Sequence, residues 1–168
     1  MTERLLSYSE GNTVVERQSR IIRTTPEHTD FQNLVQLLDT ELEIRDGELH
    51  PFYAQFNRLE GIRNVVVYFM DGSAVGCGAI RPFDGGTVEI KRMFVRPEYR
   101  ARGIGVEILH ELESWARELG YATTVLETGK KQPEAIRLYQ KSGYEITEKF
   151  GPYTKTENSL CMKKWIGE

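Results

Sequence analysis

Six residues, Arg100-Ala101-Arg102-Gly103-Ile104-Gly105, connect an apolar run to a strongly periodic segment. The run Met93-Phe94-Val95 before them predicts a strand, and apolar residues at three- and four-residue steps after them predict a helix. The first N–H groups of a helix have no partner within it, and the helix dipole favours negative charge at that end. Glycines let a phosphate approach the backbone, and arginines add charged donors. This strand, loop and helix therefore predict an anion-binding site.

Two other diphosphate-binding loops do not fit these residues. The phosphate loop of nucleoside triphosphatases requires Gly-Lys-Ser/Thr, whereas Gly105 is followed by Val106-Glu107. The dinucleotide fingerprint Gly-x-Gly-x-x-Gly requires a third glycine or alanine, where this chain has Ile108. On these residues alone, a plain strand-to-helix turn with exposed arginines remains the alternative to an anion site.

Charge is distributed unevenly along the chain. The net charge is −3, which argues against a general nucleic-acid-binding surface. Basic residues nevertheless gather in one segment, which contains Lys91, Arg92, Arg96, Arg100 and Arg102. An acidic chain with one basic patch favours a discrete anionic ligand, and no nucleic-acid partner is expected.

The length of 168 residues and the 39% hydrophobic content are those of one soluble globular domain. The chain shows no signal peptide and no membrane-spanning run, so we expect a cytoplasmic protein without a membrane partner. Cys77 and Cys161 lie in apolar runs and are expected to be buried free thiols. The three histidines show no metal-binding spacing, and no metal is expected.

Hydrophobic periodicity divides the chain into strands and helices without an internal repeat or a linker. Strands are predicted at 20–24, 65–69, 74–80, 87–95, 122–127, 144–147 and 159–165. Helices are predicted from a Thr25 cap onward, over about 47–58, over 104–119 and from Pro133 to about residue 142. Residues 1–18 carry weaker signals and are expected to form a lead-in or an extra strand, and residues 19–168 a single domain.

The strand at 87–95 has no cleanly apolar face. Strict alternation puts Glu89, Lys91, Met93 and Val95 on one face, and Ile90, Arg92 and Phe94 on the other. A mixed strand that ends at residues 100–105, here called the anion loop, is typical of a binding site. An edge strand would have the same pattern.

The loop at 100–105 resembles the coenzyme A (CoA) pyrophosphate loop of the GNAT superfamily of N-acetyltransferases, which carries Arg-x-x-Gly-x-Gly. The family also typically shows Ala-x-x-Leu-Tyr and then Gly-Phe or Gly-Tyr, and this chain has Ala135-Ile136-Arg137-Leu138-Tyr139 followed by Gly143-Tyr144. Both motifs stand in the family's order. The resemblance implies an α/β (α+β) fold, a GNAT fold with a mixed, mostly antiparallel sheet of about seven strands and about four flanking helices.

The resemblance also implies how the cosubstrate acetyl-CoA is held. Backbone groups of Met93, Phe94 and Val95 would pair with the pantetheine arm as an added strand does. The pyrophosphate would lie on Arg100, Ala101, Arg102, Gly103, Ile104 and Gly105. The strand at 87–95 would part from the strand at 122–127 to admit the cosubstrate, and Gln132 stands nearest to the family's amide-bearing cofactor contact.

Acetyl transfer to an amine needs a proton acceptor and a group that stabilises the leaving thiolate. Glu89 lies eleven residues before Arg100, the offset of the catalytic glutamate in the histone-acetyltransferase branch of the family. Glu127, a water chain without a single base, and a purely structural Glu89 paired with a cation remain the alternatives. Tyr139 resembles the family's general acid, although a buried aromatic on a helix face would look the same.

The acceptor is expected to be a primary amine of a small molecule. In this fold the first two helices and the closing hairpin usually bind it, and acidic and aromatic residues there would suit a cation. Those residues are Asp39, Glu41, Glu43, His50, Tyr53, Asn57 and Tyr153. The acidic ones could also be a solvated helix face. Acetylation of protein lysines or N-termini and a non-catalytic CoA sensor are the alternative functions, and a homodimer is compatible with the sequence.

Overall fold

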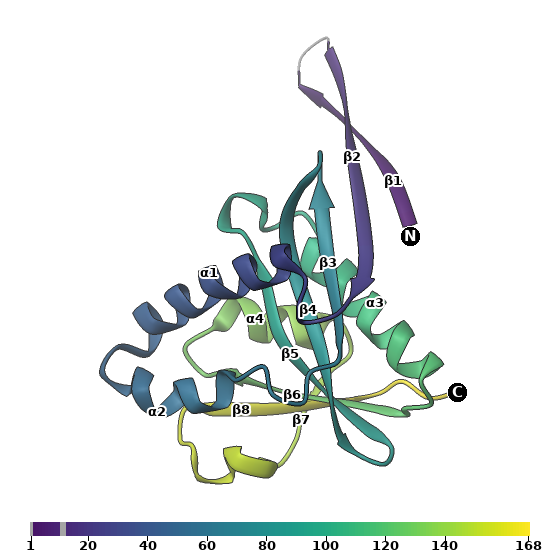
Figure 1. Cartoon of the computed structure of the whole chain (residues 1–168). Coiled ribbons are helices and arrows are strands. Elements are labelled where there is room, and N and C mark those ends of the chain that lie inside the picture. The colour runs from purple at the N-terminus through teal and green to yellow at the C-terminus, as the bar shows by residue number, and fades with distance from the viewer. Residues whose placement is uncertain (1, 11–12) are drawn as a thin grey trace.

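The computed structural model describes residues 2–10 and 13–168, which form one mixed sheet flanked by helices (Figure 1). Among these residues the sheet has eight strands in the order β1-β2-β3-β4-β5-β6-β8-β7. The strands are β1 Thr2–Glu10, β2 Thr13–Thr24, β3 Asn64–Met70, β4 Ser73–Asp84, β5 Thr87–Val95, β6 Thr123–Gly129, β7 Glu145–Ile146 and β8 Ser159–Trp165. The α-helices are α1 Thr29–Asp46, α2 His50–Ala54, α3 Ile104–Glu118 and α4 Pro133–Lys141.

Every neighbouring pair of strands is antiparallel except β5 and β6, so the predicted mixed, mostly antiparallel sheet is confirmed. The additional strand is β1, which forms a hairpin with β2. Because β2 pairs with β3 only from Ser19 to Thr24, the rest of the hairpin projects beyond the sheet (Figure 1).

The two faces of the sheet carry separate apolar cores. One core joins α3 and α4 to the sheet and includes Ile108, Leu112 and Tyr139. The other joins α1 to the opposite face and includes Phe31 and Leu34. Apolar residues of α3 recur on one side of the helix, which is why the whole helix can bury that side. In the described part of the chain, no helix is both long and apolar enough to cross a bilayer.

The first helix begins later than its sequence predicts. Thr25 does not cap it; instead, the His28 N–H donates to the Thr25 carbonyl (3.2 Å) in a turn. The helix starts at Thr29, and the Nδ1 atom of the N-cap residue His28 accepts a hydrogen bond from the Asp30 N–H (3.2 Å). The second predicted helix, at 47–58, consists of α2 between the short 3₁₀ turns η1 (Gly47–Leu49) and η2 (Gln55–Asn57).

A β-bulge interrupts β5 at Arg92. The register between β4 and β5 shifts between Cys77 and Ala79, and Arg92 has a left-handed backbone with φ of 56°. Such a conformation is uncommon for a residue with a side chain and marks a local constraint.

The bulge reverses the alternation of side chains along β5. Val88 and Ile90 pack in the α3 core, and beyond the bulge Met93 and Val95 pack against the same core. Glu89 and Lys91 therefore face the opposite layer. The expectation that Glu89, Lys91, Met93 and Val95 share one face was wrong, because the extra residue at the bulge shifts the pattern by one.

Candidate active site

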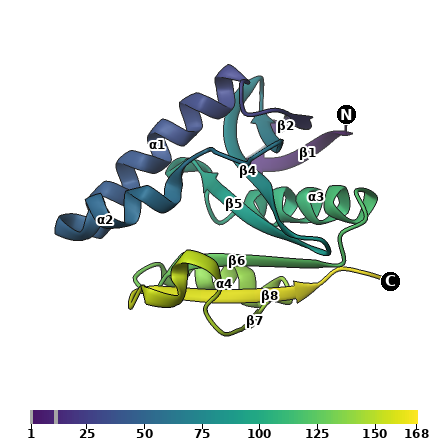
Figure 2. The ribbon, with the colours of Figure 1, turned by 60° about the horizontal axis from the view of Figure 1, so that its bottom comes forward.

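The parallel strands β5 and β6 part midway along their length. They pair only at Thr87↔Thr123, Val88↔Thr124 and Glu89↔Val125, although β5 continues to Val95 and β6 to Gly129. Figure 2 shows the two strands diverging from the end near the C-terminus. Among the described residues, the later part of β5 thus has no strand partner on its β6 side. The splay that the family resemblance implied is confirmed.

The loop after β5 has the backbone of an anion site. Ala101 and Gly103 both have a left-handed conformation, with φ of 61° and 81°, and Gly103 is the N-cap of α3. The first helical hydrogen bond there runs from the Glu107 N–H to the Gly103 carbonyl (3.1 Å). The N–H groups of residues 104–106 therefore precede the helical ladder and remain as donors for an anion.

The arginine side chains of this loop have partners within the protein. Arg100 donates from Nε to the Val95 carbonyl (2.8 Å) and binds both carboxylate oxygens of Glu41 on α1. Glu41 also accepts from Arg45 (2.9 Å), and Arg45 pairs in turn with Glu134 on α4. These ion pairs link the loop, α1 and α4 around the opening between β5 and β6.

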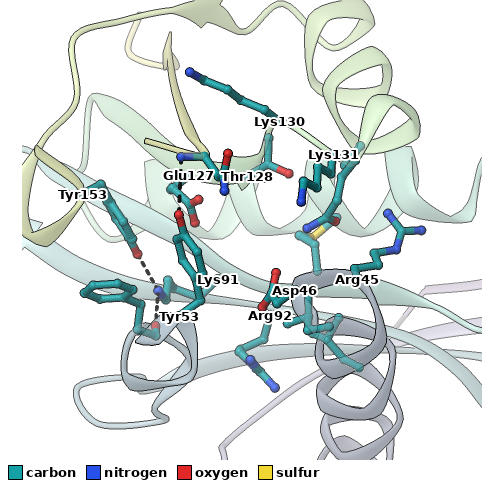
Figure 3. Close-up of a pocket in the computed structure, with 18 of the residues that line it drawn as sticks. Arg45, Asp46, Tyr53, Lys91, Arg92, Glu127, Thr128, Lys130, Lys131 and Tyr153 are labelled. Atoms are coloured by element: carbon teal, nitrogen blue, oxygen red, sulfur yellow. Dashed lines mark hydrogen bonds between the residues drawn. The ribbon is translucent and has the colours of Figure 1, made fainter. Parts of the chain in front are cut away.

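A cavity lies beside this opening, between α1 and α2 on one side and β6, the loop after it and α4 on the other (Figure 3). Of the sequence-predicted site residues, Met93, Gln132 and Tyr139 line the cavity, and so does Glu127. Glu89 does not. The sequence patterns did not single out Asp46, Lys130 and Lys131 as lining residues; two adjacent lysines directly after a strand beside the anion loop were the available signal.

The predicted acidic acceptor pocket does not form. Tyr53 and Tyr153 line the cavity, but Asp39, Glu41, Glu43 and His50 do not. Asp39 binds Arg92, Glu41 binds Arg100 and Arg45, and Glu43 is exposed. His50 lies 3.6 Å from Asp46 through Nδ1 and Oδ2. The side chain of Asn57 lies outside what the structure describes.

Glu89 is buried in an ion-pair cluster. It is 1% exposed, and its Oε1 atom lies 2.8 Å from Arg81 Nη2 and 3.4 Å from Lys91 Nζ. Arg81 is directly opposite Glu89 in the β4–β5 pair, so the register itself places the two charges together. This arrangement is the structural pairing that the sequence left open, although it does not test a catalytic role.

Lys91 connects three segments at the cavity. Its Nζ atom donates to the Phe56 carbonyl (3.0 Å) and to the Tyr153 hydroxyl (2.8 Å), which joins η2 and the 3₁₀ turn η4 (Gly151–Lys155) to β5. Burial lowers the pKa of Lys91, and the charge of Glu89 opposes that shift. In Figure 3, Lys91, Tyr153 and Glu127 point toward one another. The Lys91 side chain therefore holds this part of the cavity wall together.

Glu127 and Tyr139 have perturbed proton affinities. Burial raises the pKa of the Glu127 carboxyl above its ordinary value, against opposing effects of Ser159 and Lys91. Burial, followed by the charge of Glu127, also raises the pKa of Tyr139, so that this phenol keeps its proton at neutral pH. The Tyr139 ring packs edge-on against Tyr144 with ring centroids 5.8 Å apart. The cavity thus holds a carboxylate with increased basicity and a phenol that can donate.

Both cysteines are free and buried, as predicted. Cys77 donates from Sγ to the Arg92 carbonyl (3.4 Å) at the bulge, and burial raises its pKa to about 12. Burial also raises the pKa of Cys161. Neither thiol is activated as a nucleophile.

Residues 31–144 match the family model described as the Acetyltransferase (GNAT) family. The chain belongs to the GNAT family. This GNAT protein is 37% identical over 149 residues to an IAA acetyltransferase of Azospirillum brasilense, and the match covers 84% of this chain and 96% of that one. It is 35% identical over 128 residues to an uncharacterized N-acetyltransferase of Schizosaccharomyces pombe, with 72% and 78% covered. The family prediction is confirmed, and the protein is an acyltransferase.

Solved structures agree with this GNAT assignment. A Klebsiella pneumoniae protein assigned to the acyl-CoA N-acyltransferases superposes with a TM-score of 0.74 at 32% identity, covering 88% of this chain and 97% of that one. A GNAT acetyltransferase of Elizabethkingia anophelis with acetyl-CoA bound shares the fold, with a TM-score of 0.63 at 20% identity and 88% and 97% coverage. The GNAT fold therefore accepts acetyl-CoA in at least one solved neighbour.

Proposed function

We propose that this GNAT protein transfers an acetyl group from acetyl-CoA directly to a primary amine of a small molecule. The observation that carries the proposal is the opening between β5 and β6, which places an unpaired strand edge and an anion loop beside one cavity. Acetyl-CoA supplies the activated thioester. The loop at 100–105 holds its diphosphate, and the backbone of Met93, Phe94 and Val95 holds the pantetheine arm as an added strand would.

Different residues at the cavity then accept and donate the protons that acetyl transfer requires. Glu127 faces the cavity and accepts the proton of the incoming ammonium group, either directly or through water. Glu89 remains the alternative base, acting from its cluster with Lys91. Tyr139 donates a hydrogen bond or a proton to the departing sulfur, and Gln132 lies at the same wall for contact with the cosubstrate.

The closed wall on one side of the cavity favours a small acceptor over a protein chain. The Asn158 N–H lies 3.4 Å from the Tyr53 hydroxyl, and Lys91 ties Phe56 to Tyr153. These contacts join α2 and η2 to the closing segments, so that the second helix forms a wall rather than one side of an open groove. A polypeptide acceptor would have to displace this wall.

The test is release of free CoA thiol from acetyl-CoA with a panel of amines. Because both protein thiols are buried with raised pKa values, a thiol reagent reads released CoA with little background from native protein. We expect amine-dependent release together with an acetylated amine detected by mass spectrometry. CoA binding in calorimetry without release on any amine or peptide would instead support a CoA sensor.

A further inference from the structure

The charges that line the cavity point to the kind of amine it accepts. Among its lining residues, five are basic and two are acidic. The basic residues are Arg45, Lys91, Arg92, Lys130 and Lys131, and the acidic residues are Asp46 and Glu127. A simple cationic acceptor would meet more like charge than opposite charge in such a cavity.

Three of the five cations are already matched by carboxylates behind the cavity wall. Arg45 pairs with Glu41 and Glu134, Lys91 pairs with Glu89, and Arg92 pairs with Asp39. These cations are neutralised and attract an anion only weakly.

Lys130 and Lys131 are different. Both are exposed, and neither has an ion-pair partner among the side chains that the structure describes. Figure 3 shows Lys131 pointing towards the cavity, whereas Lys130 extends away from it. The cavity therefore presents unpaired positive charge on the loop after β6, and negative charge at Glu127 and Asp46.

The loop that carries these lysines is fixed in place. The Lys130 N–H donates to the Asn158 carbonyl (2.8 Å), and the Gln132 N–H donates to the Gly129 carbonyl (3.0 Å). Because the backbone is already anchored, only the side chain of Lys131 has to become ordered when it binds a ligand group. The backbone on either side of Lys131 is thus fixed where this residue lines the cavity.

We propose that the acceptor is an amine that also carries a carboxylate, as an amino acid does, and that Lys131 binds that carboxylate. This inference rests on the proposed acetyl transfer. The ammonium group lies toward Glu127, which takes its proton, and the carboxylate lies toward Lys131. A polyamine fits poorly, because its second ammonium group would meet Lys131. The acetyl carbon gains the bond to nitrogen and loses the bond to sulfur, and the thiolate takes up a proton.

The experiment compares matched amines in matched variants. The kcat/KM of an amino acid and of its carboxamide, for example β-alanine and β-alaninamide, is measured with wild-type protein, Lys131→Gln and Lys141→Gln. Lys141 is an exposed lysine on α4 that does not line the cavity. For each protein, the kcat/KM of the amino acid is divided by the kcat/KM of the carboxamide. Because this ratio always compares the same two amines, differences in their intrinsic reactivity cancel between variants.

We expect this kcat/KM ratio to be the same in wild type and in Lys141→Gln. In Lys131→Gln the ratio should fall by about tenfold or more, because a charge-assisted contact to the carboxylate is lost. The KM for acetyl-CoA stays unchanged. An unchanged ratio with a raised KM for acetyl-CoA overturns the inference, because Lys131 then serves the phosphates of the cosubstrate.

A binding measurement separates this inference from the proposed function. Calorimetry titrates the same two amines into protein saturated with CoA. If wild type binds the amino acid and Lys131→Gln does not, the inference is supported even when no amine is acetylated. The absence of acetylation would then count only against the proposed acetyl transfer. Equal binding of the amino acid and the carboxamide to wild type overturns it.

Discussion

Arg100 and Glu41 form a two-point ion pair, with Nη1 3.1 Å from Oε1 and Nη2 2.6 Å from Oε2. The same guanidinium donates from Nε to the Val95 carbonyl. One arginine thus joins the anion loop to the end of β5 and to α1. The carboxylate of Glu41 also places a negative charge beside the expected diphosphate position.

We predict that Glu41→Gln binds CoA more tightly, because Arg100 is then no longer neutralised and a charge that repels the diphosphate is gone. The expected gain is about threefold to tenfold at low salt and smaller at high salt. Calorimetric titration of CoA at two ionic strengths measures it. Glu43→Gln, an exposed change on the same helix, serves as the control and leaves the affinity unchanged. Weaker binding in Glu41→Gln would instead identify Glu41 as a residue that positions Arg100 for the ligand.

Tyr139→Phe is expected to lower kcat by about 10²-fold while the dissociation constant for CoA changes little. The phenol keeps its proton at neutral pH because burial raises its pKa, and phenylalanine retains the ring but has nothing to donate. Tyr144→Phe is the matched control, since the Tyr144 hydroxyl bonds Thr124 (2.8 Å) and does not line the cavity. An unchanged kcat in Tyr139→Phe removes this residue from the mechanism.

Glu127→Gln is expected to lower kcat/KM by about 10²-fold or more and to remove one ionisation from its pH profile. Since burial raises the pKa of Glu127, the wild-type rate rises with pH through a value above that of an ordinary glutamate. Glu89→Gln is compared in parallel. If it loses the ionisation and Glu127→Gln keeps it, Glu89 is the base.

The same substitution has a predicted effect on stability. A raised pKa in the folded state means that folding favours the protonated carboxyl. That contribution is fully present below the unfolded pKa and is lost as pH rises through the folded pKa. Relative to wild type, Glu127→Gln should therefore gain stability as pH rises from the unfolded pKa of glutamate, about 4.3, through the raised folded pKa, as measured by urea unfolding. A difference that does not vary with pH would contradict the raised pKa.

Gly78→Ala is expected to destabilise the fold by about 1–3 kcal/mol through overpacking. A Cβ on Gly78 would lie 2.6 Å from the Met93 sulfur, 2.7 Å from Leu112 Cδ1 and 2.9 Å from Ile108 Cγ2, where α3 packs on β4. Gly85→Ala is the control, because nothing lies within 4 Å of a Cβ at that turn. Thermal or urea unfolding of both variants measures the difference, and equal stabilities would show that the α3 core can relax around a methyl group.

The elements that the sequence predicted well depend on local chemistry. The loop at 100–105 is recognised by its glycines and arginines, and the helix after it by the spacing of its apolar residues. Both signals lie within about 20 consecutive residues. The bulge at Arg92 carries no glycine or other turn residue, so alternation predicted a regular strand. The start of α1 was missed because two capping residues, Thr25 and His28, compete within one turn.

The acceptor pocket could not be predicted because its charges depend on partners far away in the chain. Asp39 and Glu41 are acidic residues on a helix and, by composition, suit a cation. In the folded chain they bind Arg92 and Arg100, 53 and 59 residues away. The polarity of the cavity is therefore set by which charges remain unpaired after folding, and spacing along the sequence does not show this.

The bulge at Arg92 also bears on how the length of β5 can vary between related chains. Upstream of it Glu89 and Lys91 lie in the layer of α1, and downstream Met93 and Val95 lie in the layer of α3. Because the bulge supplies one residue more than regular alternation needs, a strand without Arg92 would leave both sets of side chains in these layers. A related chain that lacks this extra residue would keep the same side chains toward the cavity and would lose the contacts of Arg92 with Asp39 and the Val35 carbonyl on α1.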